Sequence, residues 1–274
     1  MPFDHVTIFC FAASYSAALL LELAFLFVQR PLLRYLATLG GAAGLLAHTI
    51  YLVAQRPTLA SQAGSLLFLA WILATFYLYG SLHYRRLAWG PFVLPVVIGL
   101  IALAQVLGSN GPVESPGQQT FLVDPEQFWQ FAHIALFLLA AVGICVAFLA
   151  SVMYLVQSQR LKEKKFSGNG IRLLNLERLE NMNRHGINWA FPLLTIGLII
   201  GLAQMAQDKV QLQGWTDPRI LSTLVLWIVF VIVLYLRYGF RLRGKRVALL
   251  TIMAFALLMV TLVTSHQHKP GGIP

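Results

Sequence analysis

Eight long apolar stretches dominate this sequence and decide what the chain can fold into. Most of them are about 18 to 25 residues long, the length that an α-helix needs to cross the hydrocarbon core of a bilayer. The chain is 58% hydrophobic and only 11% charged, with a mean hydropathy of +0.72, so it has too little charge to cover a soluble domain. We therefore predict an all-α, polytopic membrane helix bundle that forms one membrane domain over residues 1–274. The eight spans are expected at residues 6–28, 33–54, 62–82, 88–107, 128–156, 187–206, 219–238 and 246–265.

The positively charged side chains predict how these spans are oriented. If the connections are assigned alternately to the two sides of the membrane, one side receives 16 of the 20 Lys and Arg residues. The other side receives four of them, together with six of the ten acidic residues. Because Lys and Arg are concentrated in cytoplasmic loops, we expect both termini outside and the 157–186 loop inside. The 16 residues are Arg30, Arg34, Arg85, Arg86, Arg160, Lys162, Lys164, Lys165, Arg172, Arg178, Arg184, Arg237, Arg241, Arg243, Lys245 and Arg246.

Charge and cysteine content exclude several classes of protein. A net charge of +10 would suggest nucleic-acid binding in a soluble protein, but here it follows from the topology and favours contact with anionic membrane lipid. We expect no nucleic-acid partner. Cys10 and Cys145 both lie inside spans and form no C-x-x-C pair, which disfavours thioredoxin-like chemistry and a c-type cytochrome. The N-terminal residues Met-Pro-Phe-Asp-His lack the basic region of a cleaved signal peptide, so the first stretch is expected to be the first span.

Two connections stand out by their length. Residues 108–127 are rich in Gly, Pro, Ser and Gln, which predicts an irregular outer loop. The 157–186 loop begins with basic residues and breaks at Ser167-Gly168-Asn169-Gly170. Apolar side chains then recur about every third position, at Leu173, Leu176, Leu179 and Met182. We expect this part to form a short amphipathic helix that lies on the inner membrane surface.

Histidines gather at the outer end of the predicted bundle. His133 falls about one turn inside the outer end of the fifth span, and His266 and His268 follow the end of the eighth. Neutral imidazole is a common axial ligand of haem iron, and two helices that end at the same membrane face could supply two such ligands. A plain role as a polar anchor at the membrane boundary stays open for each of them.

Other polar residues lie deeper in the spans. His48 is in the outer half of the second span, where an imidazole is costly unless it faces the bundle interior; a structural hydrogen bond and a role as a ligand are both open. Glu22 is the only acid inside a span and is expected to be paired, protonated or facing a polar cavity. Trp71 and Trp227 fall in mid-span and are expected to pack between helices.

The second half of the chain resembles a known family. The matching segments are QFWQFAHIALFLLAAVGICVAFLASVMYL (127–155), WAFPLLTIGLIIG (189–201), Gly214-Trp215-Thr216-Asp217-Pro218-Arg219 and LSTLVLWIVFVIVLYLRYGFRLRGKRVALL (221–250), followed by a terminal histidine. In order and spacing they resemble the CcsA/ResC-type cytochrome c assembly proteins, most of all their shorter, eight-span HemX-like relatives. The resemblance covers the cytochrome c assembly-like half, residues 128–268, whereas 1–127 is a variable four-span half that matches only in hydropathy.

The resemblance implies a haem site at the outer face of the membrane. In this family two external histidines flank a tryptophan-rich loop and hold haem for attachment to apocytochrome c. His133 matches the first of these positions, and His266 or His268 the second, with His266 nearer the membrane. The implied ligands of the haem iron are therefore His133 and His266. The haem-binding residues that we predict are His133, His266, His268, Trp215, Asp217, Arg219 and His48.

The sequence departs from the family pattern in two places. Of the pattern W-G-x-x-W-x-W-D-P only Trp215 is kept among the tryptophans, and Thr216 stands before the Asp, so the external haem-contact surface is reduced. The in-span histidine that larger members carry before an Arg corresponds to Tyr235 ahead of Arg237. Ligation by two imidazoles is expected to persist, whereas haem transport across the membrane does not follow.

Two functions fit these residues. In the first, the chain transiently holds haem at the outer face of the bacterial cytoplasmic (inner) membrane and presents it to apocytochrome c, with a CcsB/ResB-type membrane protein as partner. No side chain suited to making bonds is evident, so we expect an assembly factor, or a subunit of a cytochrome c haem lyase, rather than an enzyme in its own right. In the second, the chain is a HemX-like membrane regulator or scaffold of haem synthesis that acts through its basic cytoplasmic loops. A small-solute transporter is disfavoured, because helix breakers do not fall at paired mid-membrane positions.

Overall fold

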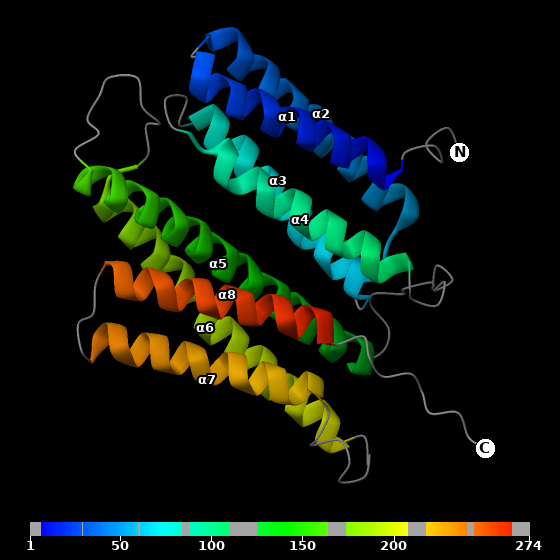
Figure 1. Ribbon diagram of the computed structural model, residues 1–274. Helices are drawn as coiled ribbons and strands as arrows, with labels where there is room; N and C mark the ends of the chain where they lie inside the picture. The colour runs from blue at the N-terminus through cyan, green and yellow to red at the C-terminus, as the bar shows by residue number, and fades with distance from the viewer. Residues whose placement is uncertain are drawn as a thin grey trace. The chain divides into compact units, whose positions relative to one another are not determined.

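The protein is a bundle of α-helices. The computed structural model describes residues 7–28, 30–59, 61–83, 88–109, 125–163, 174–207, 218–239 and 244–264, and within these ranges it contains eight α-helices and no strand (Figure 1). All eight are long and apolar enough to cross a membrane, which confirms the predicted fold class and the eight spans. The helices are α1 (Ile8–Val28), α2 (Pro31–Gln55), α3 (Gln62–His83), α4 (Gly90–Ser109), α5 (Pro125–Lys162), α6 (Leu176–Gln207), α7 (Pro218–Tyr238) and α8 (Lys245–Thr264).

Prolines and one left-handed residue set the ends of α2. Pro31 occupies the start of the helix, where its missing N–H costs nothing. At the other end Arg56 has φ 44° and ψ 53°, and its N–H donates to the Leu52 carbonyl at 3.1 Å. Pro57 follows and disfavours a further helical turn at Arg56. The chain therefore leaves α2 sharply and turns back into α3.

Two helices are longer than one membrane crossing requires. The 38 residues of α5 span about 57 Å and the 32 residues of α6 about 48 Å, against a hydrocarbon thickness of about 30 Å. The prediction of a separate amphipathic helix on the inner membrane surface is wrong, because the described residues of that segment, from Leu176 onward, form the first turns of α6. Between Leu176 and Pro192 the only glycine or proline is Gly186, which is buried against α5, and Leu179 is fully buried. The helix therefore continues without a break from the loop into the span.

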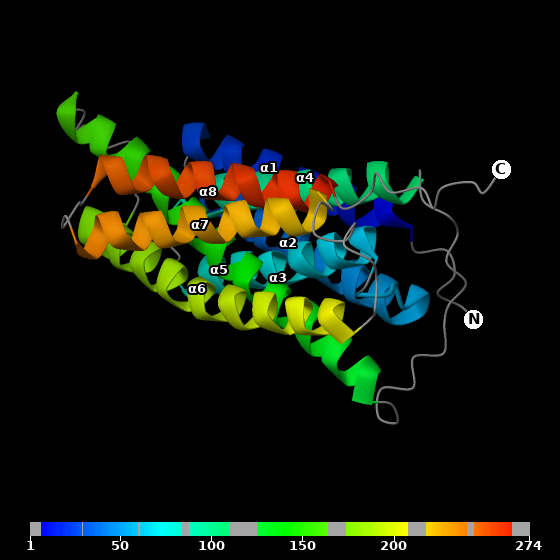
Figure 2. The same ribbon diagram turned by 90° about the horizontal axis from the view of Figure 1, so that it is seen from below.

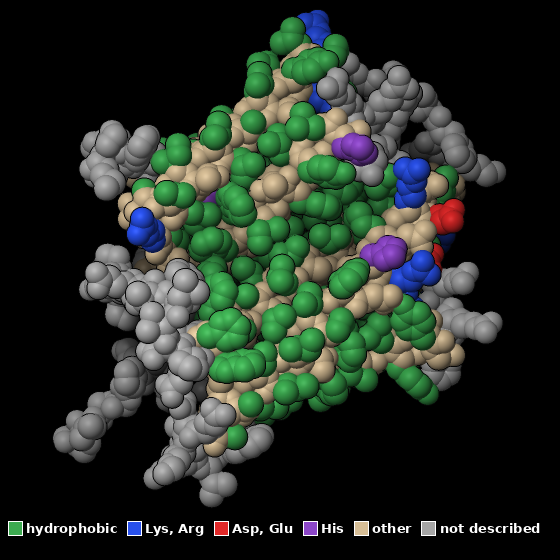
Figure 3. All heavy atoms as spheres, turned by 180° about the vertical axis from the view of Figure 1, so that it is seen from behind, with side chains coloured by type: hydrophobic (Ala, Val, Ile, Leu, Met, Phe, Trp, Pro, Cys, Tyr) green, Lys and Arg blue, Asp and Glu red, His purple; other side chains and the backbone are tan. Residues whose placement is uncertain are grey.

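The chain divides into two compact units. Unit 1 comprises Met1–Gly117 and Val156–Leu176, and unit 2 comprises Gln118–Leu155 and Glu177–Pro274. In unit 1, α1 packs on α2 and α4, and α3 packs on α2 and α4 (Figure 2). Unit 2 contains most of α5 and α6 together with α7 and α8. The side chains that point away from these packing contacts are mostly apolar on the face drawn in Figure 3, as lipid contact requires.

Each unit links two of its helices by a tryptophan and a threonine. The Trp71 indole N–H (α3) donates to Thr49 Oγ1 (α2) at 2.9 Å, and the Trp227 indole (α7) donates to Thr195 Oγ1 (α6) at 2.9 Å. Each threonine hydroxyl in turn donates to a carbonyl one turn earlier in its own helix. Both tryptophans thus lie between helices, as expected, and their indole N–H groups are satisfied without water.

Asn183 connects all four helices of unit 2. Its side-chain N–H groups lie within donating distance of Ser151 Oγ (2.8 Å) and the Ala147 carbonyl (3.1 Å) on α5 and of Thr251 Oγ1 (3.1 Å) on α8. Its Oδ1 accepts from Arg237 Nη1 on α7 at 2.7 Å, and Arg237 Nη2 donates to the Glu180 carbonyl at 3.3 Å. Asn183 is 5% exposed and Arg237 8% exposed. We call Asn183 and the five residues around it the Asn183 cluster. The five residues are Ala147, Ser151, Glu180, Arg237 and Thr251.

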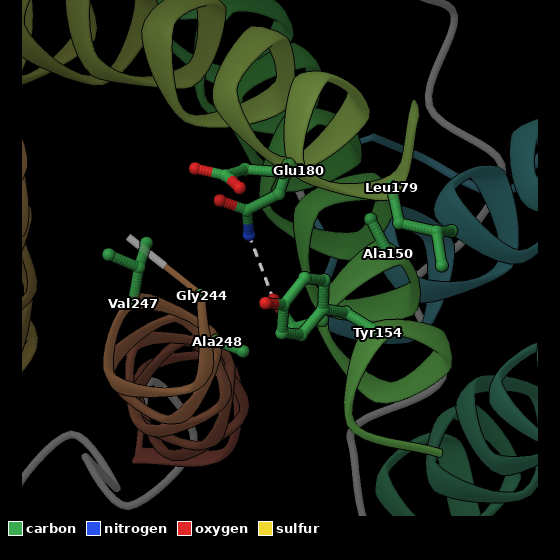
Figure 4. A pocket seen from close by; sticks show the side chains of 9 residues that line it. Ala150, Tyr154, Leu179, Glu180, Gly244, Val247 and Ala248 are labelled. Atoms are coloured by element: carbon green, nitrogen blue, oxygen red, sulfur yellow. Dashed lines mark hydrogen bonds between the residues drawn. The ribbon is translucent and has the colours of Figure 1, made fainter. Parts of the chain in front are cut away.

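A small cavity lies beside the Asn183 cluster. Figure 4 shows Tyr154, Glu180, Gly244 and Val247 around it, and its volume is about 10 Å³, room for about one water molecule. Gly244 has φ +74°, and a β-carbon there would lie 2.7 Å from the Tyr154 hydroxyl oxygen. The turn into α8 thus needs glycine for its backbone conformation and for this close approach. A cavity of this size accommodates no porphyrin.

Replacing Asn183 with Ala is expected to lower the free energy of unfolding by about 2–3 kcal/mol, because it removes the acceptor of Arg237 Nη1 and the buried amide that joins α6 to α5 and α8. Asn188→Ala is the matched control: Asn188 is also on α6 and also pairs with an α7 side chain, the Tyr238 hydroxyl, but at an exposed position. The Asn188→Ala variant is expected to lose less than about 1 kcal/mol of the free energy of unfolding. Reversible unfolding in mixed micelles measures both, and equal costs for the two variants would contradict a special role for Asn183.

Candidate functional site

The structure places only part of the predicted haem-binding set. His133 lies on α5 and His48 on α2, and both side chains are described. Arg219 is in the first turn of α7, but the described part of the chain includes only its backbone. Trp215, Asp217, His266 and His268 lie outside the described residues. His133 and His48 belong to different units, so each is considered within its own.

His133 makes one short hydrogen bond to the neighbouring helix. Its Nδ1 lies 2.7 Å from the Gly197 carbonyl oxygen of α6. A carbonyl oxygen only accepts, so the ring proton must be on Nδ1. The neutral ring therefore keeps its lone pair on Nε2, the tautomer that is ready to bind a metal, and the bond to the carbonyl also fixes the ring orientation.

The His133 ring is packed on a second glycine of α6. A β-carbon built on Gly201 would lie 2.8 Å from His133 Cε1 and 3.1 Å from Nδ1, closer than carbon atoms approach without overlap. The imidazole thus lies directly against the α6 backbone, one helical turn beyond the carbonyl that it binds. His133 itself is half-buried, so one side of the residue is covered by α6 and part of it is accessible.

Helices α5 and α6 run antiparallel in one register from His133 to Ala147 on α5 and from Asn183 to Gly197 on α6. Ala147 is bonded to Asn183, Gly143 faces Gly186, and His133 is bonded to Gly197. At the middle contact, a β-carbon on either glycine would lie within 3 Å of the other glycine's carbonyl oxygen. These contacts fix which residue of α6 lies opposite His133.

Exposed aromatic side chains precede His133 on α5. Trp129 is 51% exposed and Phe128 58% exposed, with their rings edge to face at 5.7 Å. Trp129 lies four residues before His133, so the two side chains share a face of the helix. A flat apolar ligand bound at His133 would meet an aromatic surface there.

His48 is in a very different environment. It is fully buried between α1 and α2, with its ring stacked on Phe11 at 4.2 Å and 2° and edge to face with Tyr15. Neither ring nitrogen has a hydrogen-bond partner among the described residues. Ligation of iron by His48 stays a prediction, and it would require the packing around its two buried ring nitrogens to open.

Glu22 is also buried in unit 1, at 1% exposure. The Tyr77 hydroxyl of α3 donates to Glu22 Oε1 at 3.3 Å. The carboxyl group lies against Gly90, the first residue of α4, where the free N–H groups of a helix start favour a negative charge. This acid therefore has a structural environment that holds α1, α3 and α4 together.

The functional residues that sequence reasoning missed are Gly197, Gly201 and Asn183. The spacing G-x-x-x-G at 197–201 is a signal of close helix packing in membranes and could have indicated the first two. An asparagine deep in an apolar helix could have indicated the third. Within the described residues no group of three or more His, Cys, Asp or Glu side chains could hold a metal ion.

Comparisons with known proteins identify the family. The chain matches the family model described as "Cytochrome C assembly protein" over residues 59–268, which begins well before the segments on which the resemblance rested. It is 23% identical to the cytochrome c biogenesis protein CcsA of Gloeobacter violaceus, with 92% of this chain and 89% of that protein covered. It is 25% identical to the CcsA of a Synechococcus strain (84% and 83% covered) and 27% identical to the protein HemX of Bacillus subtilis (78% and 75% covered). No solved structure matches.

The family match covers well over half of the chain, and the alignments with the CcsA relatives cover most of the length of those proteins. The eight membrane-spanning helices agree with a multi-pass membrane protein. The chain therefore belongs to the cytochrome c assembly protein family, and this membership supports a role in cytochrome c biogenesis.

Proposed function

We propose that this chain holds haem at the outer face of the bacterial cytoplasmic membrane and presents it for attachment to apocytochrome c. Haem is the cargo, and His133 supplies one axial ligand through Nε2. The observation that supports this most directly is the hydrogen bond from His133 Nδ1 to the Gly197 carbonyl at 2.7 Å. In the neutral ring this bond leaves the lone pair on Nε2, and a backbone carbonyl behind the ring is a common arrangement for a metal-ligating histidine.

The second ligand comes from the end of α8. His266 or His268 follows Thr264, the last residue of that helix, and His266 is the nearer of the two. Trp215, Asp217 and Arg219 precede or begin α7 and would contact the porphyrin or its propionates. We add Trp129 to this set, because its exposed ring is one turn from His133 on the same face of α5. It would replace part of the aromatic surface that the short loop before α7 lacks.

The chain's own chemistry is to bind and orient haem. An imidazole that is held as the Nδ1–H tautomer donates no proton to a substrate from its free nitrogen, so His133 suits ligation rather than acid catalysis. Bond formation between haem and an apocytochrome would fall to the cysteine thiols of the acceptor. We infer a CcsB/ResB-type membrane partner that brings the acceptor to this face.

The ligand assignment is tested by absorption spectroscopy of the protein purified in mild detergent. The wild type is expected to bind haem with a low-spin spectrum, and His133→Ala is expected to lose it because iron loses an axial ligand. Added imidazole should restore the low-spin spectrum in His133→Gly by entering the space of the missing ring. His185→Ala is the control, since His185 is an exposed histidine near the other end of unit 2. A colourless wild type, or an unchanged spectrum in His133→Ala, would overturn the proposal.

The proposal also requires His133 on the outer side of the membrane, with both termini outside. Two exposed glutamines serve as reporters: Gln55 at the end of α2 should be outside and Gln159 near the end of α5 inside. In a Cys10→Ser, Cys145→Ser background, Gln55→Cys should react with a membrane-impermeant maleimide on intact cells. Gln159→Cys should react only after lysis. The reverse pattern would place His133 at the cytoplasmic face.

A second function is favoured by the similarity to HemX. In that case the chain is a membrane regulator or scaffold of haem synthesis that acts through the basic residues between α5 and α6. Replacing residues 164–173 with a Gly-Ser linker keeps both helices and removes Lys164, Lys165 and Arg172. If the scaffold function holds, this variant should change the level of haem precursors while the haem spectrum persists. Unchanged precursor levels together with defective cytochrome c in His133→Ala would exclude it.

A further inference from the structure

We propose that Gly201 is a positioning residue, which holds the His133 imidazole in the one orientation where Nδ1 is bonded and Nε2 is available to iron. This inference rests on the proposed function for its purpose. It predicts that the tautomer of His133 depends on the absence of a side chain at position 201. The tautomer can be measured without haem.

The closest contacts at Gly201 are made by His133. The three atoms nearest to a β-carbon built there are His133 Cε1, Nδ1 and Nε2, at 2.8, 3.1 and 3.5 Å. A methyl group at this position would overlap the ring and push it away from α6. The hydrogen bond to Gly197, at 2.7 Å, depends on the same ring position. A displaced ring would lose that bond and with it the constraint that keeps the proton on Nδ1.

Gly197 lies one turn earlier on the same helix and acts differently. It contributes its backbone carbonyl, which any residue could supply. A β-carbon on Gly197 would lie 3.6 Å from Leu136 Cβ and 3.8 Å from the His133 carbonyl oxygen, which are ordinary van der Waals distances. Alanine is therefore expected to fit at 197 and not at 201. The pair gives a control in which the same substitution is made one helical turn away.

Close approach of the two helix backbones does not explain Gly201. That approach occurs at Gly143 and Gly186, where an added β-carbon on either residue would meet the backbone carbonyl of the other at 2.9 or 2.7 Å. At Gly201 the nearest atoms belong to a side chain, so the space that glycine leaves is filled by the imidazole. The requirement for glycine at 201 should therefore disappear when the imidazole is removed.

The first test is the tautomer of His133 in the haem-free protein labelled with ¹⁵N-histidine, with the His133 signals assigned by their loss in His133→Gln. We expect the Nδ1–H pattern in the wild type and in Gly197→Ala, and its loss in Gly201→Ala. Haem titration of the same proteins should show an affinity about 10- to 100-fold lower for Gly201→Ala, the usual effect of disturbing the group that orients a metal ligand. Gly99→Ala, on α4 where an added β-carbon would meet no atom within 4 Å, should bind like the wild type.

The second test separates positioning from general packing. In a His133→Ala background, Gly201→Ala should have no further effect on thermal unfolding, because the methyl group enters the space that the ring has left. An equal loss of stability in both backgrounds would overturn the inference, as would an unchanged tautomer and affinity in Gly201→Ala. If Gly197→Ala loses the Nδ1–H tautomer of His133 as Gly201→Ala does, the inference is also wrong. If His133→Ala keeps the wild-type haem spectrum, the proposed function fails, whereas the tautomer experiment still decides the role of Gly201.

Discussion

The bilayer interior offers no hydrogen bonds, and this single constraint accounts for the side-chain hydrogen bonds that join the helices of the protein. A polar group inside a span has to find its partner on a neighbouring helix or on its own backbone. Trp71 and Trp227 find threonines, and Asn183 joins four helices through one side chain. His133 finds the Gly197 carbonyl. The same rule that stabilises the helix packing therefore also decides the protonation of the proposed ligand.

The Asn183 cluster and His133 are coupled through the antiparallel pair α5 and α6. Asn183 and the Gly143–Gly186 contact set the register of this pair on the side of His133 that leads to the end of α5. If α6 slid by one residue along α5, the carbonyl opposite His133 would be replaced by one that points in another direction, since successive residues are rotated by about 100° around the helix. A polar cluster far from the proposed haem site is thus a precondition for its geometry.

Hydropathy was enough to predict the all-helical fold and the eight spans, because the need to cover about 30 Å of hydrocarbon leaves few alternatives. The position of His133 near one end of α5 was predictable for the same reason. Its partner was not, because hydropathy does not encode the register between two apolar helices. The prediction of a short helix on the inner membrane surface was wrong for a related reason. The periodic leucines do predict a helix, but whether Leu179 meets lipid or a neighbouring helix depends on tertiary packing, and it is fully buried.

His48 and His133 show why depth in the membrane is a weak guide to ligand function. His48 and His133 both lie in apolar helices, yet His48 is stacked on Phe11, fully buried and without a hydrogen-bond partner among the described residues. Its tautomer is not fixed by any described group, and both ring nitrogens are buried, so a metal has no open approach to them. His133 is half-buried and has one nitrogen committed to a carbonyl. A ligand has to be oriented and accessible at the same time, and of the two only His133 meets both conditions.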